Sequence, residues 1–170
     1  MRVIKIINNS ITEIKQVLDS YVLQTNEIQS DVGEIGQIMQ SDGTFIDAIP
    51  PLEQVKLSKL TQINNAYNQK LNDGFTSSAT GTPYTFGYGQ MDREKFMQLT
   101  ISVLSNIATF PIPIPAKNGT IVLHDQTQYN QILADINAFA WAQQNRLQQL
   151  SQQVQASFTV DEVNALVVSF

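Results

Sequence analysis

The sequence predicts an α+β protein in which a small, mostly-β N-terminal module precedes a helical domain with short β hairpins and a long C-terminal helix. Residues 1–50 contain runs of alternating apolar residues separated by turn residues, which is typical of strands. After Pro51 the apolar spacing changes to that of a helix. About thirty residues from Asp125 onward keep one apolar stripe. We therefore expect two domains, residues 1–50 and 51–170.

The N-terminal module is built from two predicted hairpins. Alternating apolar residues flank Asn8-Asn9-Ser10, a sequence that suits a tight turn between two strands. Ser41-Asp42-Gly43 predicts a second turn, because Asp and Gly tolerate the positive φ values that such turns need. Phe45 and Ile46 open the return strand, and Pro50-Pro51 ends the module.

Two amphipathic helices are expected next. The first covers residues 52–73 and stops at Gly74, since glycine readily adopts the left-handed conformation that ends a helix. Its apolar face consists of Leu52, Val55, Leu60, Ile63, Tyr67 and Leu71. The second begins near Asp92, which we expect to be its N-cap. Its apolar stripe consists of Phe96, Leu99, Val103, Leu104 and Ile107.

A proline-rich strand and a turn precede the long helix. Pro111, Pro113 and Pro115 alternate, which predicts an edge or polyproline-like strand because proline donates no hydrogen bond to a sheet. Lys117-Asn118-Gly119 then turns into a second strand, residues 120–124.

The long helix is expected to begin at Asp125, which has capping-box spacing to Gln128. Its stripe consists of Leu133, Ile136, Ala140, Leu147, Leu150 and Val154. Thr159 is expected to cap a short final helix. The apolar residues of that helix are Val163, Leu166 and Val167.

Composition excludes several classes of function. The net charge is −5 and no Lys/Arg cluster exceeds a pair, so we expect no nucleic-acid binding. The absence of cysteine removes disulfides, thiolate nucleophiles and cysteine-based zinc sites. No apolar run is long enough for a signal peptide or a membrane span, so we expect a soluble protein made in a cytoplasm. Only 15% of residues are charged and amides are abundant, which hints at a chain that stays in an assembly.

No catalytic, metal or cofactor site is predicted, and we expect the protein not to be an enzyme. The only histidine, His124, precedes a helix cap, where packing is the favoured role. Four acidic residues sit at expected helix starts, where the helix dipole favours negative charge: Asp92, Glu94, Asp161 and Glu162. A glycosidase-type pair from remote positions stays open as an alternative. Its candidates are Asp92, Glu94, Asp125, Asp161 and Glu162.

The loop GFTSSATGTPYTFGYGQMD, residues 74–92, is the most distinctive stretch. It lacks the lysine of a phosphate-binding loop, the third glycine of a dinucleotide fingerprint and the Gly-x-Ser-x-Gly of a nucleophile elbow. Three aromatic residues alternate in it and would share one strand face, which is usually core and alternatively a partner surface. The partner-contact candidates, including two from the amide-rich stretch 143–155, are Phe75, Tyr84, Phe86, Tyr88, Gln144 and Gln148.

The same loop resembles a family of bacteriophage tail-associated domains of undefined biochemical function. In that family an amphipathic helix ends in Gly-Phe-Thr-Ser-Ser, and a Gly-x-Pro-aromatic-x-aromatic strand follows. The resemblance covers about residues 28–170. The matching residues are Gly74, Phe75, Thr76, Ser77, Ser78, Gly81, Pro83, Tyr84 and Phe86.

The resemblance implies a non-enzymatic structural component of a bacteriophage tail, at the baseplate or the tail-fibre attachment. Such a protein would be made in the host bacterial cytoplasm, reside in the virion tail, and bind other tail or tail-fibre proteins as a homo-oligomer or in several copies. One alternative is a tail-fibre assembly chaperone that is not retained in the virion. Another is a carbohydrate-binding tail protein that uses Tyr84, Phe86 and Tyr88, or a glycan-degrading one.

Overall fold

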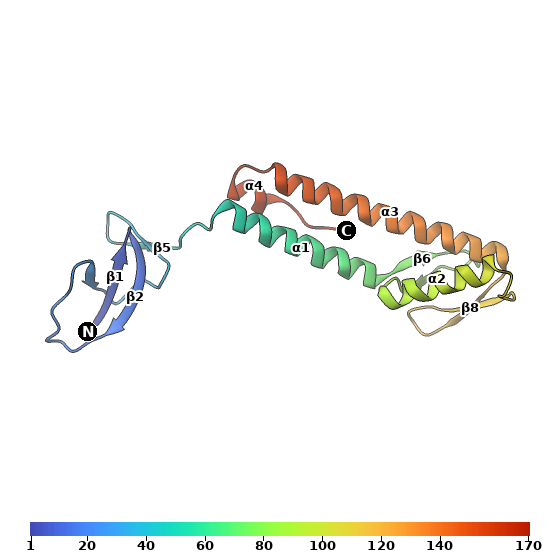
Figure 1. Ribbon diagram of the computed structural model, residues 1–170, viewed down its shortest axis with the longest axis horizontal. Helices are drawn as coiled ribbons and strands as arrows, with labels where there is room; N and C mark the ends of the chain where they lie inside the picture. The colour runs from blue at the N-terminus through green and yellow to red at the C-terminus, as the bar shows by residue number, and fades with distance from the viewer. The chain divides into compact units, whose positions relative to one another are not determined.

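The computed structural model describes all 170 residues, and the chain divides into two compact units, Met1–Pro50 and Pro51–Phe170. Strands make up the regular structure of the first unit, while helices and two β hairpins make up the second (Figure 1). The predicted α+β class, with a small β module followed by a helical part and a long C-terminal helix, is confirmed.

The N-terminal unit is one five-stranded antiparallel sheet with the strand order β3-β1-β2-β4-β5. Both predicted hairpin turns are confirmed: Asn8 and Asn9 have φ values of 51° and 63°, and Gly43 has a φ of 83°. One short strand was not predicted, namely β3. The strands are β1 (Arg2–Ile7), β2 (Ser10–Gln16), β3 (Glu27–Gln29), β4 (Ile38–Met39) and β5 (Phe45–Ile46).

A buried carboxylate ties β2 to β3 in this sheet. Glu27 accepts hydrogen bonds from the ammonium group of Lys15, from the Tyr21 hydroxyl at 3.0 Å and from the Gln24 backbone N–H at 2.8 Å. The Lys15 ammonium group, followed by the Gln24 N–H, lowers the pKa of the Glu27 carboxyl. The same contact with Glu27 raises the pKa of Lys15. The buried charge is tolerated here because three donors, one of them positively charged, bond the carboxylate.

The C-terminal unit is organised by two long helices that run antiparallel, side by side (Figure 1). These are α1 (Leu52–Asp73) and α3 (Gln126–Ala156), and both expected apolar faces point away from solvent. Two shorter helices are α2 (Gln90–Leu104) and α4 (Val160–Ala165). The two antiparallel hairpins pair β6 (Phe75–Ser77) with β7 (Tyr84–Phe86), and β8 (Ile112–Pro115) with β9 (Ile121–His124).

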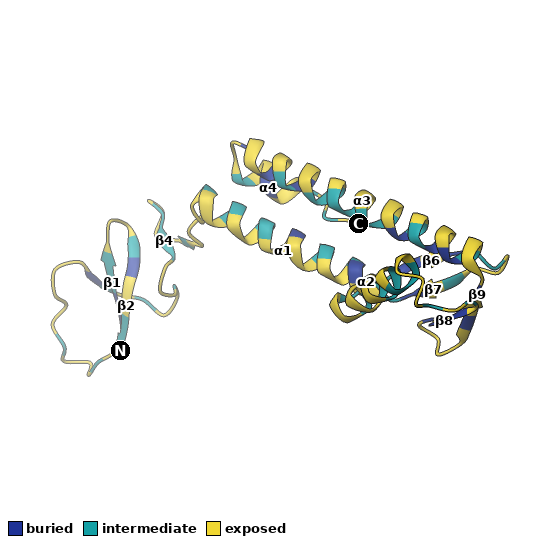
Figure 2. Ribbon diagram, turned by 45° about the vertical axis from the view of Figure 1, so that its right-hand side comes forward, coloured by how far each residue is buried: buried dark blue, intermediate teal, exposed yellow.

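The apolar core of this unit consists of two separate clusters, seen as dark blue segments toward either end of the helix pair (Figure 2). The larger cluster joins the two hairpins and α2 to the first half of α3. Its buried members are Phe75, Phe86, Ile112, Ile114, Ala116, Val122, Tyr129, Ile132 and Ile136. The smaller cluster, Ile63, Leu150 and Val154, joins α1 to the second half of α3.

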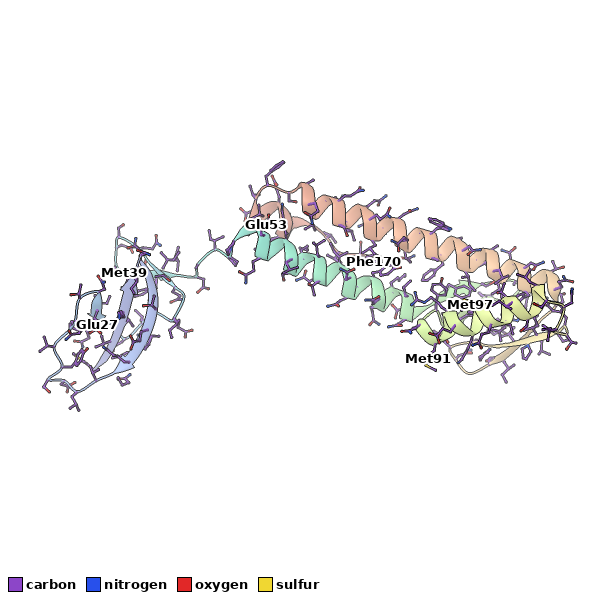
Figure 3. All side chains as sticks on the ribbon, in the orientation of Figure 1. Glu27, Met39, Glu53, Met91, Met97 and Phe170 are labelled. Atoms are coloured by element: carbon purple, nitrogen blue, oxygen red, sulfur yellow. The ribbon has the colours of Figure 1, made fainter.

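The segment that follows α4 completes the smaller cluster. Leu166, Val168 and Phe170 pack against it, and the Phe170 ring lies 5.8 Å from the Tyr67 ring, between centroids (Figure 3). Lys59 Nζ donates to the Leu166 carbonyl at 3.1 Å. These contacts fix an extended segment along the helix pair.

The expected helix boundaries are confirmed at three positions. Gly74 ends α1 with a φ of 83°. Asp125 and Gln128 form the predicted capping box, in which the Gln128 N–H donates to Asp125 Oδ1 at 2.8 Å. Thr159 caps α4 in the same way, with Glu162 as its reciprocal partner.

Other details were predicted wrongly. The helix α2 starts at Gln90 with Gly89 as its N-cap, and Asp92 is the third helical residue, where its Oδ2 accepts from the Gly89 N–H at 3.2 Å. Leu104 and Ile107 are exposed, because α2 ends at Leu104 and the chain turns away. Val167 is likewise exposed, because it lies beyond the end of α4.

Candidate functional site

Two of the four aromatic residues of the 74–92 loop, Phe75 and Phe86, form core. Phe75 and Phe86 are paired across the β6–β7 hairpin, with ring centroids 5.7 Å apart, and are only 4% and 1% exposed. Phe75 also lies 6.0 Å from the Phe96 ring of α2. Both side chains are covered by their own fold, and their contact with a partner stays a prediction.

The remaining four contact candidates do reach the surface to different extents. Tyr84 and Tyr88 are half-buried at the rim of the larger cluster, and the Tyr88 ring stands edge-on to Phe139 with centroids 5.6 Å apart. On α3, Gln144 is half-buried and Gln148 is exposed. Tyr88 and Gln144 line a common depression in the surface, whereas Tyr84 and Gln148 do not.

His124 is a core residue. It is 1% exposed, and its ring stands edge-on to Phe86 with centroids 5.8 Å apart. Burial lowers the pKa of its imidazole, because the apolar surroundings disfavour the charged form. Its Nδ1 has no hydrogen-bond partner. The packing role expected from its position is confirmed.

The acidic residues considered for glycan hydrolysis lie at or near the N-terminal ends of three different helices. Asp92 and Asp125 bond backbone N–H groups of α2 and α3, and Glu162 accepts from the Phe158 N–H at 2.7 Å. Glu94 accepts from the Gln90 side chain at 3.2 Å. No three His, Asp or Glu side chains gather into a group that could hold a metal ion.

Two adjoining pockets of about 240 and 250 Å³ run along one side of α3, and they share Tyr88 and Arg93. We call them together the aromatic groove. The positions that α3 contributes recur every three or four residues and so lie on one helical face. The lining residues are Tyr67, Tyr88, Arg93, Phe96, Met97, Thr100, Leu133, Ile136, Asn137, Ala140, Trp141 and Gln144.

The groove combines aromatic rings with unused hydrogen-bond donors. Trp141 is 68% exposed although it is the only tryptophan of the chain. The Tyr67 hydroxyl donates to Gln144 Oε1 at 3.2 Å, which leaves the Gln144 amide nitrogen free to donate. The guanidinium carbon of Arg93 lies 5.7 Å from the centre of the Tyr88 ring. Arg93 forms no ion pair.

A second surface feature lies on the β8–β9 hairpin, whose inward residues alternate with outward ones. Pro113 faces Leu123 and Pro115 faces Ile121 across the two strands. All four side chains are exposed, Ile121 by 66% and Leu123 by 57%. We call these four residues the outer hairpin face.

Helix α2 also exposes apolar residues, at helical spacing. Met97, Ile101 and Leu104 lie three and four residues apart on one side of the helix, and all three are exposed. Figure 3 labels Met97 on this helix. No helix combines the length and the apolar character needed to cross a membrane.

Sequence reasoning missed most of the groove. Tyr67 was assigned to the core face of α1, and neither Arg93, Asn137 nor Trp141 was singled out. One available signal was a lone tryptophan next to the apolar stripe of α3, four residues after Asn137. The residues come from three helices and the 74–92 loop, so no local motif could have assembled them.

The fold and its surface define an α+β protein with a small β module and a helical domain that carries the aromatic groove and the outer hairpin face. Residues 54–167 match the family model described as a domain of unknown function (DUF4376). The chain therefore belongs to the DUF4376 family, whose domain occupies most of the C-terminal unit. No curated protein and no solved structure matches the chain.

Proposed function

We propose that this protein is a non-enzymatic structural component of a bacteriophage tail, at the baseplate or the tail-fibre attachment, and that it acts through protein–protein contacts. The outer hairpin face is the observation that carries the contact role. The assignment to a phage tail rests on the likeness of residues 74–86 to tail-associated domains, described above.

The outer hairpin face has the chemistry of a contact surface. Its four residues are apolar, adjacent across two strands and exposed, although the same strands bury their alternate residues. Covering such a surface releases about 25 cal/mol per Å² of apolar area. Pro113 and Pro115 donate no backbone hydrogen bonds, so a strand added along β8 would lack two donors, and we assign the contact to side chains.

The partners in this proposal are other tail or tail-fibre proteins, and the protein is present in several copies, as a homo-oligomer or within a multi-copy assembly. The low charge of the chain suits this role, because only 15% of its residues carry a charge that would have to be desolvated at an interface. The exposed stripe of Met97, Ile101 and Leu104 on α2 offers a second contact area.

The test is to identify the proteins of purified phage particles by mass spectrometry, with the wild-type chain supplied from a plasmid to a phage that lacks its gene. We expect the chain to remain in the particles. Replacing Ile121 and Leu123 by serine should remove it. Leu57→Ser, at an exposed apolar position on α1, is the matched control and should be retained.

Two results would change the proposal. A chain that is needed for fibre attachment yet absent from particles would be an assembly chaperone. Retention of the Ile121→Ser, Leu123→Ser double variant at the wild-type level would show that the outer hairpin face is not the contact surface.

A further inference from the structure

We propose that the aromatic groove binds a saccharide, and that it prefers an acidic sugar, one that carries a carboxylate, over its neutral counterpart. This inference goes beyond the tail role and does not depend on it. It rests on the rings, the unused donors and the single positive charge that line the groove.

Three aromatic rings of the groove, one exposed and two half-buried, provide stacking surfaces. A sugar ring presents an apolar face of C–H groups and a rim of hydroxyls, so a protein recognises it with an aromatic face beside polar groups. Trp141 is largely exposed, and Tyr67 and Tyr88 line the same pocket from α1 and from the loop before α2. Trp141 is not among the buried residues of α3, so it contributes little to the core of this fold.

The donors are placed to bond the hydroxyl rim. The Gln144 amide oxygen is occupied by the Tyr67 hydroxyl, so its nitrogen is oriented with two hydrogens to donate. Asn137 makes no side-chain hydrogen bond within the chain and lines the adjoining pocket. Neutral amides bond hydroxyl groups without the desolvation cost of a buried charge.

Arg93 supplies the preference for an acidic sugar. It is the only charged residue that lines either pocket, and no carboxylate of the chain pairs with it. Its guanidinium group lies over the Tyr88 ring, which restricts its position. A planar guanidinium group bonds a carboxylate through two parallel N–H groups, so a ligand carboxylate would find an ordered, unpaired partner.

The size of the groove favours a saccharide over a protein surface. The two pockets together fall within the roughly 300–1,000 Å³ range that is typical of small-ligand sites. Trp, Tyr and Arg are also enriched among the hot-spot residues of protein–protein interfaces. There, however, these side chains are fully desolvated and surrounded by a larger apolar contact area. The outer hairpin face contributes no lining residue to either pocket, and of the exposed stripe on α2 only Met97 lines one of them.

Trp141 makes the test direct, because it is the only tryptophan and reports on its own surroundings. The full chain is titrated with trisaccharides of glucuronic, galacturonic and mannuronic acid, each beside its methyl-esterified neutral form, while tryptophan fluorescence is recorded. Isothermal titration calorimetry gives the affinities. We expect at least one acidic trisaccharide to shift the fluorescence and to bind at least tenfold more tightly than its ester.

Substitutions then locate the site. Arg93→Gln should weaken binding of the acidic trisaccharide at least tenfold and leave binding of the ester unchanged. Lys95→Gln removes the same charge from the same helix outside the groove and should have no effect. Trp141→Ala should abolish binding in calorimetry, whereas Phe158→Ala, at an exposed aromatic residue elsewhere, should not. Unchanged circular dichroism and melting temperature show that each variant is folded.

Several results would overturn the proposal: no binding of any trisaccharide in the panel, equal affinity for acids and esters, or binding that survives both Arg93→Gln and Trp141→Ala. Loss of a protein partner on Trp141→Ala, without saccharide binding by the wild type, would identify the groove as a protein interface instead. Retention in phage particles is measured separately, so failure of this proposal and failure of the tail role give different results.

Discussion

The α-carbon of Gly74 faces the backbone carbonyl of Phe86 so closely that a β-carbon on Gly74 would lie 1.9 Å from the Phe86 oxygen. Gly74 also has a φ of 83°, in the region that side chains disfavour. The helix stop and the aromatic strand of the 74–92 loop are therefore joined at one point, where only glycine fits.

We predict that Gly74→Ala destabilises the C-terminal unit by more than about 2 kcal/mol. The alanine side chain would strain the positive φ, and the backbone at Phe86 would also have to move away from the new β-carbon. The free energy of unfolding is measured in urea by Trp141 fluorescence, which reports on this unit alone. Gly81→Ala is the control: Gly81 has a φ of 85° with no atom in reach of a β-carbon, so only the conformational cost of about 1–2 kcal/mol applies. Equal costs for both variants would contradict the close approach.

The larger apolar cluster should depend strongly on Ile132, which is fully buried on α3. We predict that Ile132→Ala costs about 2–5 kcal/mol of unfolding free energy, the range for deleting buried methyl groups and leaving a cavity. Ile101→Ala removes the same atoms from an exposed position on α2 and should change stability by no more than about 0.5 kcal/mol. Urea unfolding measures the free energy of unfolding of both variants. A loss at Ile132→Ala as small as that at Ile101→Ala would contradict the burial of Ile132 in the larger cluster.

Asp92 should stabilise α2 from its third position rather than as the N-cap. We predict that Asp92→Ala costs about 1 kcal/mol, because the Gly89 N–H loses its acceptor. Glu94→Ala removes the same charge two residues further from the cap and loses only a bond to the exposed Gln90 side chain, so it should cost less than half as much. A larger loss at Glu94 would indicate that charge alone, and not the bond to Gly89, stabilises this helix start.

The N-terminal sheet should lose stability in acid through Glu27. Its folded pKa is lowered, chiefly by the Lys15 ammonium group, so the folded state binds the Glu27 proton more weakly than the unfolded state. The stabilisation is present above about pH 4.3, the ordinary pKa of a glutamate, and is lost as the pH falls through the lower folded value.

The matching measurement is an NMR pH titration of the amide signals of residues 1–50, with the folded fraction followed between neutral and acidic pH. Glu27→Gln cannot hold the charge, so it should be less stable at neutral pH and should lack this acid transition. If Glu27→Gln keeps the acid transition, another carboxylate must be responsible for it. Asp47→Asn, at an exposed carboxylate in the same unit, serves as the control.

Local signals predicted much of the fold. The Asn8-Asn9 and Asp42-Gly43 turns, the glycine at the end of α1 and the capping box before α3 each depend on a few adjacent residues with fixed conformational preferences. The helical stripes of α1 and α3 extend over many turns, so their periods are unambiguous.

The errors arose where distant contacts decide the outcome. The strand β3 is three residues long and pairs with the distant β1, and its Glu27 bonds Lys15 of β2, which no local pattern reveals. Leu104 continued the stripe of α2 in sequence, yet no partner covers it. The aromatic groove joins Tyr67 to Trp141 across seventy-odd residues, so only the folded chain brings them together.

The separation of the two apolar clusters leaves the middle of α3 as the part of the C-terminal unit that should unfold locally most easily. Between Ile136 and Leu150, α3 has no fully buried residue, so the stretch between the clusters is held mainly by its own backbone bonds and by half-buried contacts. Amide hydrogens there should exchange with solvent by local opening, faster than those of the flanking turns. The groove residues Ala140, Trp141 and Gln144 lie on this stretch. A ligand bound to them would stabilise the stretch against local opening, so the two apolar clusters would unfold together in one cooperative transition.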